Sequence, residues 1–295
     1  MNVGIVQMEP GLRRLTAANS SPMTFRGTNT YLLGKGSVAV IDPGPEDPVH
    51  LDALLGATAG GERISHILVT HSHLDHSPLA RALAAIADAP VLAFGTHTDG
   101  RSPRMRQLAR TGLAGGGEGA DTAFAPDLRL EDGAIVTGDG WTVEALHTPG
   151  HTANHMCFAW NGALFTGDLV MGWASSIISP PDGDLTAFMT SCKRLAGRRD
   201  HILYPGHGEP VTDPAGRIAW LIAHRRSRER QILAALGETP EDIPTLTRRV
   251  YSDIPPALLA AAERNLLAHL IDLCERGKAA VIGELSSESL FRGIE

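Results

Sequence analysis

The sequence is poor in several features that would place a protein in a specialised class. Its 295 residues include only three cysteines, which lie far apart and form no CxxC pair: Cys157, Cys192 and Cys274. This spacing argues against a disulfide framework and against a zinc site built from thiolates. No apolar run approaches the ~20 residues of a membrane span, and the first residues lack the basic and apolar segments of a secretory signal. These absences predict a protein that does not cross the membrane and resides in the cytoplasm.

The sequence also lacks a net positive charge and has few aromatic side chains. The net charge is −7 at pH 7, and aromatic residues make up 5% of the chain. A protein of this charge has no general attraction for nucleic acid, and few aromatic rings are available for base stacking. Hydrophobic residues, at 43%, are sufficient for a large core. The length suits one large domain with a small appendage.

The secondary-structure pattern of the sequence changes along the chain. Short strand patterns dominate between Thr28 and Leu164, and long helical patterns follow Pro214. A stretch punctuated by prolines, residues 238–244, separates two of these helical segments. We therefore predict an α/β fold with a strand-rich domain and its connecting helix over residues 1–236, and a small domain over residues 237–295.

Turn and cap residues mark individual elements of the first domain. Gly34-Lys35-Gly36 joins two alternating segments and predicts a β-hairpin. A buried strand is expected over residues 64–70. Ser77 is expected to cap a helix that has Pro78 as its first residue, and residues 185–197 have the pattern of an amphipathic helix.

The most informative stretch is THSHLDH, residues 70–76. Four side chains of metal-ligand type, His71, His73, Asp75 and His76, fall within six consecutive positions at the end of a predicted strand. Imidazole nitrogen and carboxylate oxygen suit Zn²⁺, and also Mn²⁺ or Fe²⁺. A lone histidine at a strand end is usually a core or surface residue. Four such residues leaving one strand rarely coincide by chance, so the stretch predicts a metal site.

Three further candidates, His151, Asp168 and His207, each lie where a predicted strand gives way to a loop. Together the seven residues provide for two adjacent metal ions, and a carboxylate can bridge them. Two ions about 3.5–4 Å apart hold a hydroxide between them and neutralise charge on an attacked carbonyl or phosphoryl group. The nucleophile then needs no serine or cysteine, in agreement with the lack of a GxSxG motif.

The ordered motifs THSHLDH, TPGHT, TGD and PGHG, between about Gly27 and Gly208, resemble the metallo-β-lactamase superfamily. The resemblance implies an αβ/βα sandwich with a dinuclear site at one edge, between the two sheets. It also implies that Asp75 orients the attacking water or relays its proton. The sequence departs from the family at Ser77-Pro78, where Gly-Gly or Gly-Ala is common. The implied ligands are His71, His73 and His151 for one metal, Asp75, His76 and His207 for the other, and Asp168 as the bridge.

Further segments narrow the resemblance to the β-lactamase-like protein 2 group. These are GTNTYLLG, FTGDLVMGWASS, YPGHGEPV, the helix around HRRSRERQIL, and NLLAHLIDLCERG. The resemblance implies that residues 237–295 form a winged-helix-like domain. The group includes a single-strand endoribonuclease, and similar sequences include thioesterases that act on acyl chains bound to carrier proteins.

Other segments are open to two interpretations. The basic helix 224–230 can contact phosphates, but a solvated helix face is the favoured interpretation. The glycine-rich loop 112–119 can cover a site. Histidines outside the motifs, His224 and His269 among them, are taken as structural or exposed. Residues on the loop after Asp168 are candidates for substrate contact: Trp173, Ser175 and Ser176.

The sequence thus predicts a hydrolase with two divalent ions, Zn²⁺ in the first place, and a bridging hydroxide as its nucleophile. Single-stranded RNA is the favoured substrate, because two cations fit a phosphodiester transition state. An acyl thioester is the alternative, and the apolar segment 170–178 favours it. A regulator that binds metal without catalysis is a third reading. The complete ligand set argues against it.

Overall fold

The first sheet has seven strands, which lie side by side in chain order. The computed structural model describes residues 4–113 and 119–294. The predicted hairpin around Lys35 is present, and the strands that follow it pair in parallel. The strands are β1 (Val6–Glu9), β2 (Leu12–Thr16), β3 (Asn29–Leu33), β4 (Ser37–Ile41), β5 (Arg63–Leu68), β6 (Val91–Ala93) and β7 (Leu128–Arg129).

The second sheet has five strands in the order β12-β11-β10-β9-β8. Neighbouring strands are antiparallel except β11 and β12, which are parallel and are connected through a helix. The strands are β8 (Ile135–Gly138), β9 (Trp141–His147), β10 (Met156–Trp160), β11 (Ala163–Gly167) and β12 (Ile202–Pro205).

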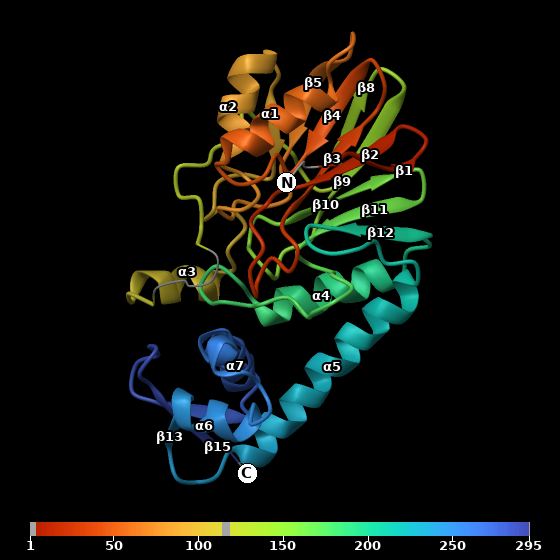
Figure 1. Cartoon of the computed structure of the whole chain (residues 1–295). Coiled ribbons are helices and arrows are strands. Elements are labelled where there is room, and N and C mark those ends of the chain that lie inside the picture. The colour runs from red at the N-terminus through yellow and green to blue at the C-terminus, as the bar shows by residue number, and fades with distance from the viewer. Residues whose placement is uncertain (1–3, 114–118, 295) are drawn as a thin grey trace.

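Alternation of side chains along the strands builds two layers of core on each sheet. In β4, Ala39 and Ile41 pack toward the second sheet, whereas Val38 and Val40 pack under the outer helices with Leu54. The second sheet turns its other face toward two further helices. Figure 1 shows the resulting sandwich, which confirms the predicted αβ/βα architecture. The helices that cover it are α1 (Pro48–Ala57), α2 (Leu79–Ala87) and α4 (Leu185–Ala196), together with the start of α5 (Pro214–Ala235). Helix α3 (Pro103–Arg110) instead packs its buried residues against C-terminal helices.

The long helix α5 leads from the sandwich to a smaller C-terminal unit (Figure 1). A separate core holds this unit together and includes Ile232, Leu246, Leu270 and Phe291, with Leu108 of α3 packed against them. The winged-helix-like character predicted for this end is confirmed by its helices and three-stranded sheet, but the boundary at 236/237 stays a prediction. Its elements are β13 (Glu241–Asp242), α6 (Ile243–Val250), η1 (Pro256–Leu258), α7 (Leu259–Glu275), β14 (Ala279–Ile282) and β15 (Leu290–Gly293).

Two local features differ from the sequence prediction. Strands β1 and β2 precede Thr28, where no strand was expected; Pro10 and Gly11, with φ of 85°, form the turn between them. Ser77 is not the cap of α2, since the helix begins at Leu79 and its start has no side-chain cap. The Ser77 hydroxyl instead donates to a carboxylate oxygen of Asp121 at 2.8 Å.

Two further predictions concern loops and membranes. Residues 114–118 of the glycine-rich loop 112–119 lie outside the described residues, so its expected covering role stays a prediction. Within the two described ranges, no helix has both the length and the apolar character needed to cross a membrane.

Candidate metal centre

All seven residues predicted as metal ligands meet at one edge of the sandwich. The first four follow β5, and the others follow β9, β11 and β12. Their side chains form three overlapping groups in which the candidate ligand atoms all lie within 4.8 Å of one another. All are buried. The groups are His71 with His73 and His151, His71 with His76 and Asp168, and Asp75 with His76 and His207.

The first group consists of three imidazoles. His73 Nδ1 lies 3.1 Å from His71 Nε2 and 3.1 Å from His151 Nε2. Burial, with a smaller effect of the neighbouring imidazoles, holds the pKa of His71 well below its usual value and lowers that of His73 to about 3. Neutral imidazoles keep a lone pair, so His71 and His73 present nitrogens that can coordinate a cation.

The third group combines the imidazoles of His76 and His207 with the carboxylate of Asp75. Asp75 Oδ2 lies 3.3 Å from His76 Nε2 and 3.1 Å from His207 Nε2. Burial opposes charge on both histidines, but the nearby carboxylates outweigh it; the pKa of His76 is raised well above its usual value and that of His207 to about 10. This half of the site therefore attracts positive charge.

Asp168 belongs to the remaining group and lies between the first group and the third. Its Oδ1 is 3.5 Å from His76 Nε2, and its Oδ2 is 3.3 Å from His207 Nε2 and 3.7 Å from His151 Nε2. A single carboxylate thus faces both groups, which is the arrangement a bridging ligand requires.

Unsatisfied oxygens test whether a cation suits this site. Oδ1 of Asp75 and Oδ1 of Asp168 are buried and accept no hydrogen bond from any residue that the structure describes. The pKa of each carboxyl is held well below its usual value. Burial raises this pKa, but the neighbouring histidines together lower it by more than burial raises it. Buried ionised carboxylates are normally paired or coordinate metal. The donor set of imidazole nitrogen and carboxylate oxygen fits divalent Zn²⁺, Mn²⁺ or Fe²⁺.

Hydrogen bonds from the opposite ring nitrogens orient the histidines, as is usual for metal-binding imidazoles. His76 Nδ1 lies 2.9 Å from Asp42 Oδ2, His151 Nδ1 lies 2.7 Å from the carbonyl of Ile177, and His207 Nδ1 lies 3.2 Å from that of Gly27. These contacts leave Nε2 of each ring free to face the centre.

Asp42 supports the candidate ligands and was not among the residues predicted from the sequence. It follows β4 and accepts hydrogen bonds from the backbone N–H of Thr70 at 2.7 Å and from its hydroxyl at 2.7 Å, in addition to the one from His76. Asp42 therefore fixes the start of the ligand-bearing loop and the tautomer of His76. Its only signal in the sequence is a carboxylate placed directly after a buried strand and before Pro43-Gly44.

The side chains of two candidate ligands leave no room for a side chain at Gly206. A Cβ atom there would lie 2.5 Å from Asp168 Oδ1 and 2.6 Å from His76 Cε1. Glycine at this position allows β12 to deliver His207 next to the other ligands.

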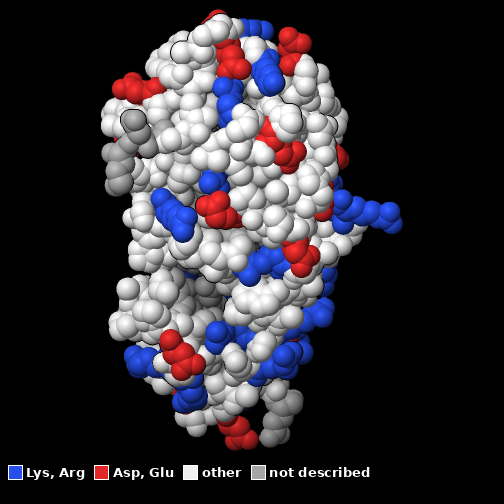
Figure 2. All heavy atoms as spheres, turned by 45° about the vertical axis from the view of Figure 1, so that its right-hand side comes forward, with Lys and Arg blue, Asp and Glu red and all other residues white. Residues whose placement is uncertain are grey.

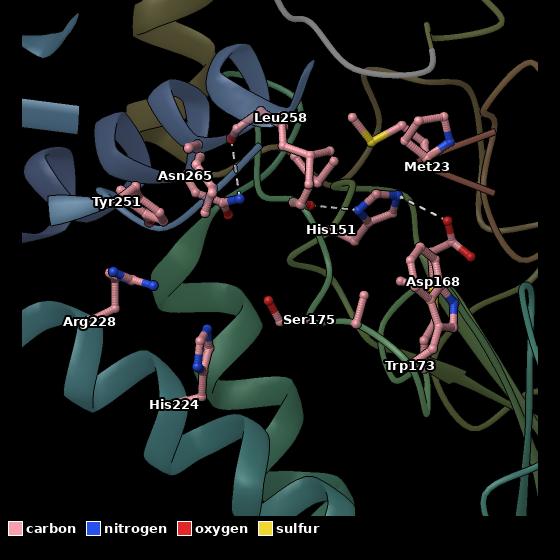
Figure 3. A pocket seen from close by; sticks show the side chains of 17 residues that line it. Met23, His151, Asp168, Trp173, Ser175, His224, Arg228, Tyr251, Leu258 and Asn265 are labelled. Atoms are coloured by element: carbon pink, nitrogen blue, oxygen red, sulfur yellow. Dashed lines mark hydrogen bonds and ion pairs between the residues drawn. The ribbon is translucent and has the colours of Figure 1, made fainter. Parts of the chain in front are cut away.

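A cavity of about 250 Å³ opens beside the centre, and both His151 and Asp168 line it. Figure 3 shows these two residues at one end of the cavity, with Arg228 and Tyr251 at the other. The wall is mostly apolar and combines loops of the sandwich with α5 and the C-terminal unit. Its apolar members are Pro22, Met23, Met171, Trp173, Ala174, Ile177, Tyr251, Ile254, Leu258, Ala261 and Ala262.

The three candidates for substrate contact have different positions. Trp173 and Ser175 line the cavity. Ser176 is fully buried at 0% exposure and does not line it; its hydroxyl donates to the backbone carbonyls of Asp168 and Leu169. Ser176 thus holds the loop in shape.

The basic helix segment 224–230 is only partly the solvated face that the sequence favoured. Arg225 is 3% exposed, and Arg228 donates to the Val250 carbonyl at 2.6 Å and stacks on Tyr251. His224, taken from the sequence as structural or exposed, lines the cavity with Arg228. The turn of α5 that faces the C-terminal unit brings these side chains inward, and this contact has no local sequence signal.

Two histidines near the motifs have other partners. The ring of His147 stacks on Phe94 at 3.8 Å, and its Nε2 lies 2.9 Å from the Ala153 carbonyl. His155 is fully buried and contacts the Thr148 hydroxyl through Nδ1 at 3.0 Å. Neither belongs to the groups of ligand atoms found among the described residues.

Comparison with known proteins agrees with this geometry. The Metallo-beta-lactamase superfamily matches residues 23–207, and the Beta-lactamase associated winged helix domain matches residues 243–287. A Beta-lactamase-like protein 2 homolog of Drosophila melanogaster is 32% identical, over 94% of this chain and 92% of that protein. An Atrochrysone carboxyl ACP thioesterase of Claviceps purpurea is 32% identical, over 79% of this chain and 67% of that protein.

A solved structure extends the similarity over nearly the whole chain. A metallo-beta-lactamase family protein from Thermus thermophilus superimposes with a TM-score of 0.76 at 25% identity, covering 97% of this chain and 99% of that one. Both the sandwich and the C-terminal unit are therefore shared. Sandwich, ligand motifs and appended domain together show that this chain belongs to the metallo-beta-lactamase superfamily of hydrolases, in the group similar to the β-lactamase-like protein 2 homologs.

Proposed function

We propose that this chain is a dinuclear metal-dependent hydrolase of acyl thioesters. His71, His73 and His151 hold one divalent ion, Asp75, His76 and His207 hold the other, and Asp168 bridges them; Zn²⁺ suits this donor set. The contacts of Asp168 support this division, because its Oδ2 lies 3.7 Å from Nε2 of His151 in the first set and 3.3 Å from Nε2 of His207 in the second. When bound, the ions lower the pKa of water and stabilise negative charge that develops on the attacked carbonyl.

Asp75 is proposed to orient the attacking water and to accept its proton. Thr28 donates to Asp75 Oδ2 at 3.1 Å, whereas Oδ1 has no hydrogen-bond partner among the described residues. The neighbouring histidines keep the carboxyl ionised, since its pKa is held well below the usual range against the effect of burial. A carboxylate with one free oxygen is suited to accept a hydrogen bond from water.

The apolar cavity beside Asp168 is the observation that supports an acyl thioester as the substrate. Apolar side chains such as Met171, Ile177 and Leu258 line its walls and favour burial of an acyl chain. RNA requires several cations along its path to neutralise phosphates, but among the described residues that line the cavity Arg228 is the only Lys or Arg. The thioesterase name of the Claviceps purpurea relative supports the same choice. The cavity therefore favours the thioester over the RNA that the sequence favoured.

Three polar side chains of the cavity come from two places, the loop that follows Asp168 and helix α5. Ser175 lies on the loop after Asp168, and Arg228 and His224 lie on α5 (Figure 3). In the proposed complex the acyl carbonyl lies next to Asp168, and Arg228 binds an oxygen-bearing or anionic group at the distant end of the substrate.

Single-stranded RNA is the second candidate, and one observation favours it. Trp173 is 37% exposed at the cavity, and its ring stacks on Phe25 with 5.0 Å between centroids. An exposed aromatic pair is a platform on which a base can stack.

Hydrolysis assays with both substrate classes test the proposal. We expect metal-loaded protein to release thiol from acyl thioesters of coenzyme A, to leave a labelled single-stranded RNA intact, and to lose thioester hydrolysis in His73→Ala. Thiol release is followed with a chromogenic disulfide, and elemental analysis confirms the metal. Cleavage of RNA that disappears in His73→Ala, without thioester hydrolysis, would overturn the choice of substrate but not the metal centre.

A further inference from the structure

A second cavity lies on α5, lined by residues of this helix other than those that line the cavity beside the metal centre. It has a volume of about 460 Å³ and is lined by α4, α5 and α7; we call it the α4–α5–α7 groove. None of the seven candidate metal ligands lines it. The groove is therefore separate from the cavity of the proposed hydrolysis, although α5 contributes to both.

The groove has an excess of positive charge. Five of its lining side chains are Lys or Arg and two are carboxylates, and both carboxylates are engaged by Arg276, at 2.9 Å from Glu229 and 2.6 Å from Asp272. Figure 2 shows Lys and Arg side chains gathered over this lower half of the molecule. Three exposed cations of the groove have no hydrogen bond or ion pair within the described ranges: Lys193, Arg226 and Arg230.

Two buried polar side chains also line the groove. His269 is 1% exposed, and neither of its ring nitrogens has a hydrogen-bond partner among the residues described. Burial, together with nearby arginines, lowers the pKa of His269 to about 3, so the ring is neutral and offers one N–H donor. Buried polar groups are normally hydrogen-bonded, and an unpaired one calls for a partner.

Arg225 is the second buried group. Its guanidinium donates to the Ser176 carbonyl and to Asn265 Oδ1 at 3.0 Å, but Nε has no partner, and no carboxylate of the described residues lies within ion-pair distance. A buried cation without a counter-ion is unfavourable. An anion in the groove supplies negative charge to Arg225 and an acceptor to His269.

We propose that the α4–α5–α7 groove binds the phosphate group of a small phosphorylated molecule. Lys and Arg side chains from α4, α5 and the end of α7 line the groove, and the oxygens of a phosphate accept charge-assisted hydrogen bonds from both residue types. The volume lies in the range of small-molecule sites, so there is space for an organic group beside the phosphate. This ligand site is independent of the substrate of the metal centre.

Calorimetric titration of the metal-loaded full chain tests the proposal. The probes are inorganic phosphate and adenosine 5′-monophosphate, which distinguish a free phosphate from one carried by an organic group. We expect at least one to bind, and the double variant Arg226→Ala/Arg230→Ala to weaken binding by about tenfold or more, because two charge-assisted contacts are lost. The matched control is Lys35→Ala/Arg63→Ala, which removes two exposed cations far from the groove.

A second variant tests the buried histidine. We expect His269→Leu to weaken phosphate binding, and to leave the melting temperature without phosphate unchanged or raised, because it removes an unpaired buried polar group. If phosphate bound at the metal centre instead, its affinity would not change with the substitutions in the groove. Equal affinity in wild type, the Arg226/Arg230 pair and His269→Leu, or no binding of either probe, would overturn the proposal.

Discussion

The metal centre and the cavity beside it are built by different means. Ligands of the centre come from loops that directly follow strands of both sheets, and hydrogen bonds from groups such as Asp42 fix their rings. Much of the cavity wall comes from helices, and Tyr251 and Leu258 belong to the C-terminal unit. The difference teaches that strand ends of the sandwich assemble the candidate metal centre, whereas residues of the appended unit form part of the cavity wall, where the proposed function places the selection of substrate.

The largest effect is expected at the bridging carboxylate. Asp168→Ala removes the group that faces both halves of the centre, so we expect loss of at least one metal ion. Hydrolysis should fall by more than about 100-fold, above the effect of losing a residue that only supports a ligand. Elemental analysis and the thioester assay measure both. Asp139→Ala, at an exposed carboxylate, is the control. Full metal content and activity in Asp168→Ala would contradict the assignment of this ligand.

A smaller effect is expected from the residue that orients a ligand. Asp42→Asn keeps the shape of the side chain but removes the charge that holds His76 Nδ1–H and the Thr70 groups. Metal affinity or activity should fall by about 10–100-fold. Competition with a chelator measures the affinity, and Asp52→Asn on the exposed face of α1 serves as the control. A variant indistinguishable from wild type would show that Asp42 has only a structural role.

The smallest effect is expected in the cavity wall, and only for some substrates. Ala262→Leu narrows the cavity, so kcat/KM for a long acyl chain should fall by about tenfold, the scale at which a pocket discriminates small apolar groups. Metal content and hydrolysis of an acetyl thioester should stay unchanged. Ala219→Leu, on the exposed side of α5, is the control. An equal loss for short and long chains would break the proposed division between chemistry and selection.

The ordered motifs of the sequence, through the resemblance that they carry, predicted the sandwich, and the fold brings the seven residues predicted as metal ligands together at one edge. The ligands occur in short motifs at strand ends, and this local spacing carries over directly into the fold, where the strand ends meet at one edge. Strand and helix periodicity likewise predicted a strand-rich region followed by a helical region. Strands β1 and β2 were missed, because both are short, β1 is partly exposed, β2 contains two arginines, and the signal between them is only a Pro-Gly turn.

Only the tertiary structure determined which residues support the centre and which shape the cavities. Asp42 lies 34 positions before His76, so their contact depends on the pairing of β4 with β5. The inward placement of His224 and Arg228, and the burial of Arg225 and His269, depend on how α5 and α7 pack. Such contacts join residues far apart in the chain, and a sequence pattern records the periodicity of one element but not the neighbour against which it packs.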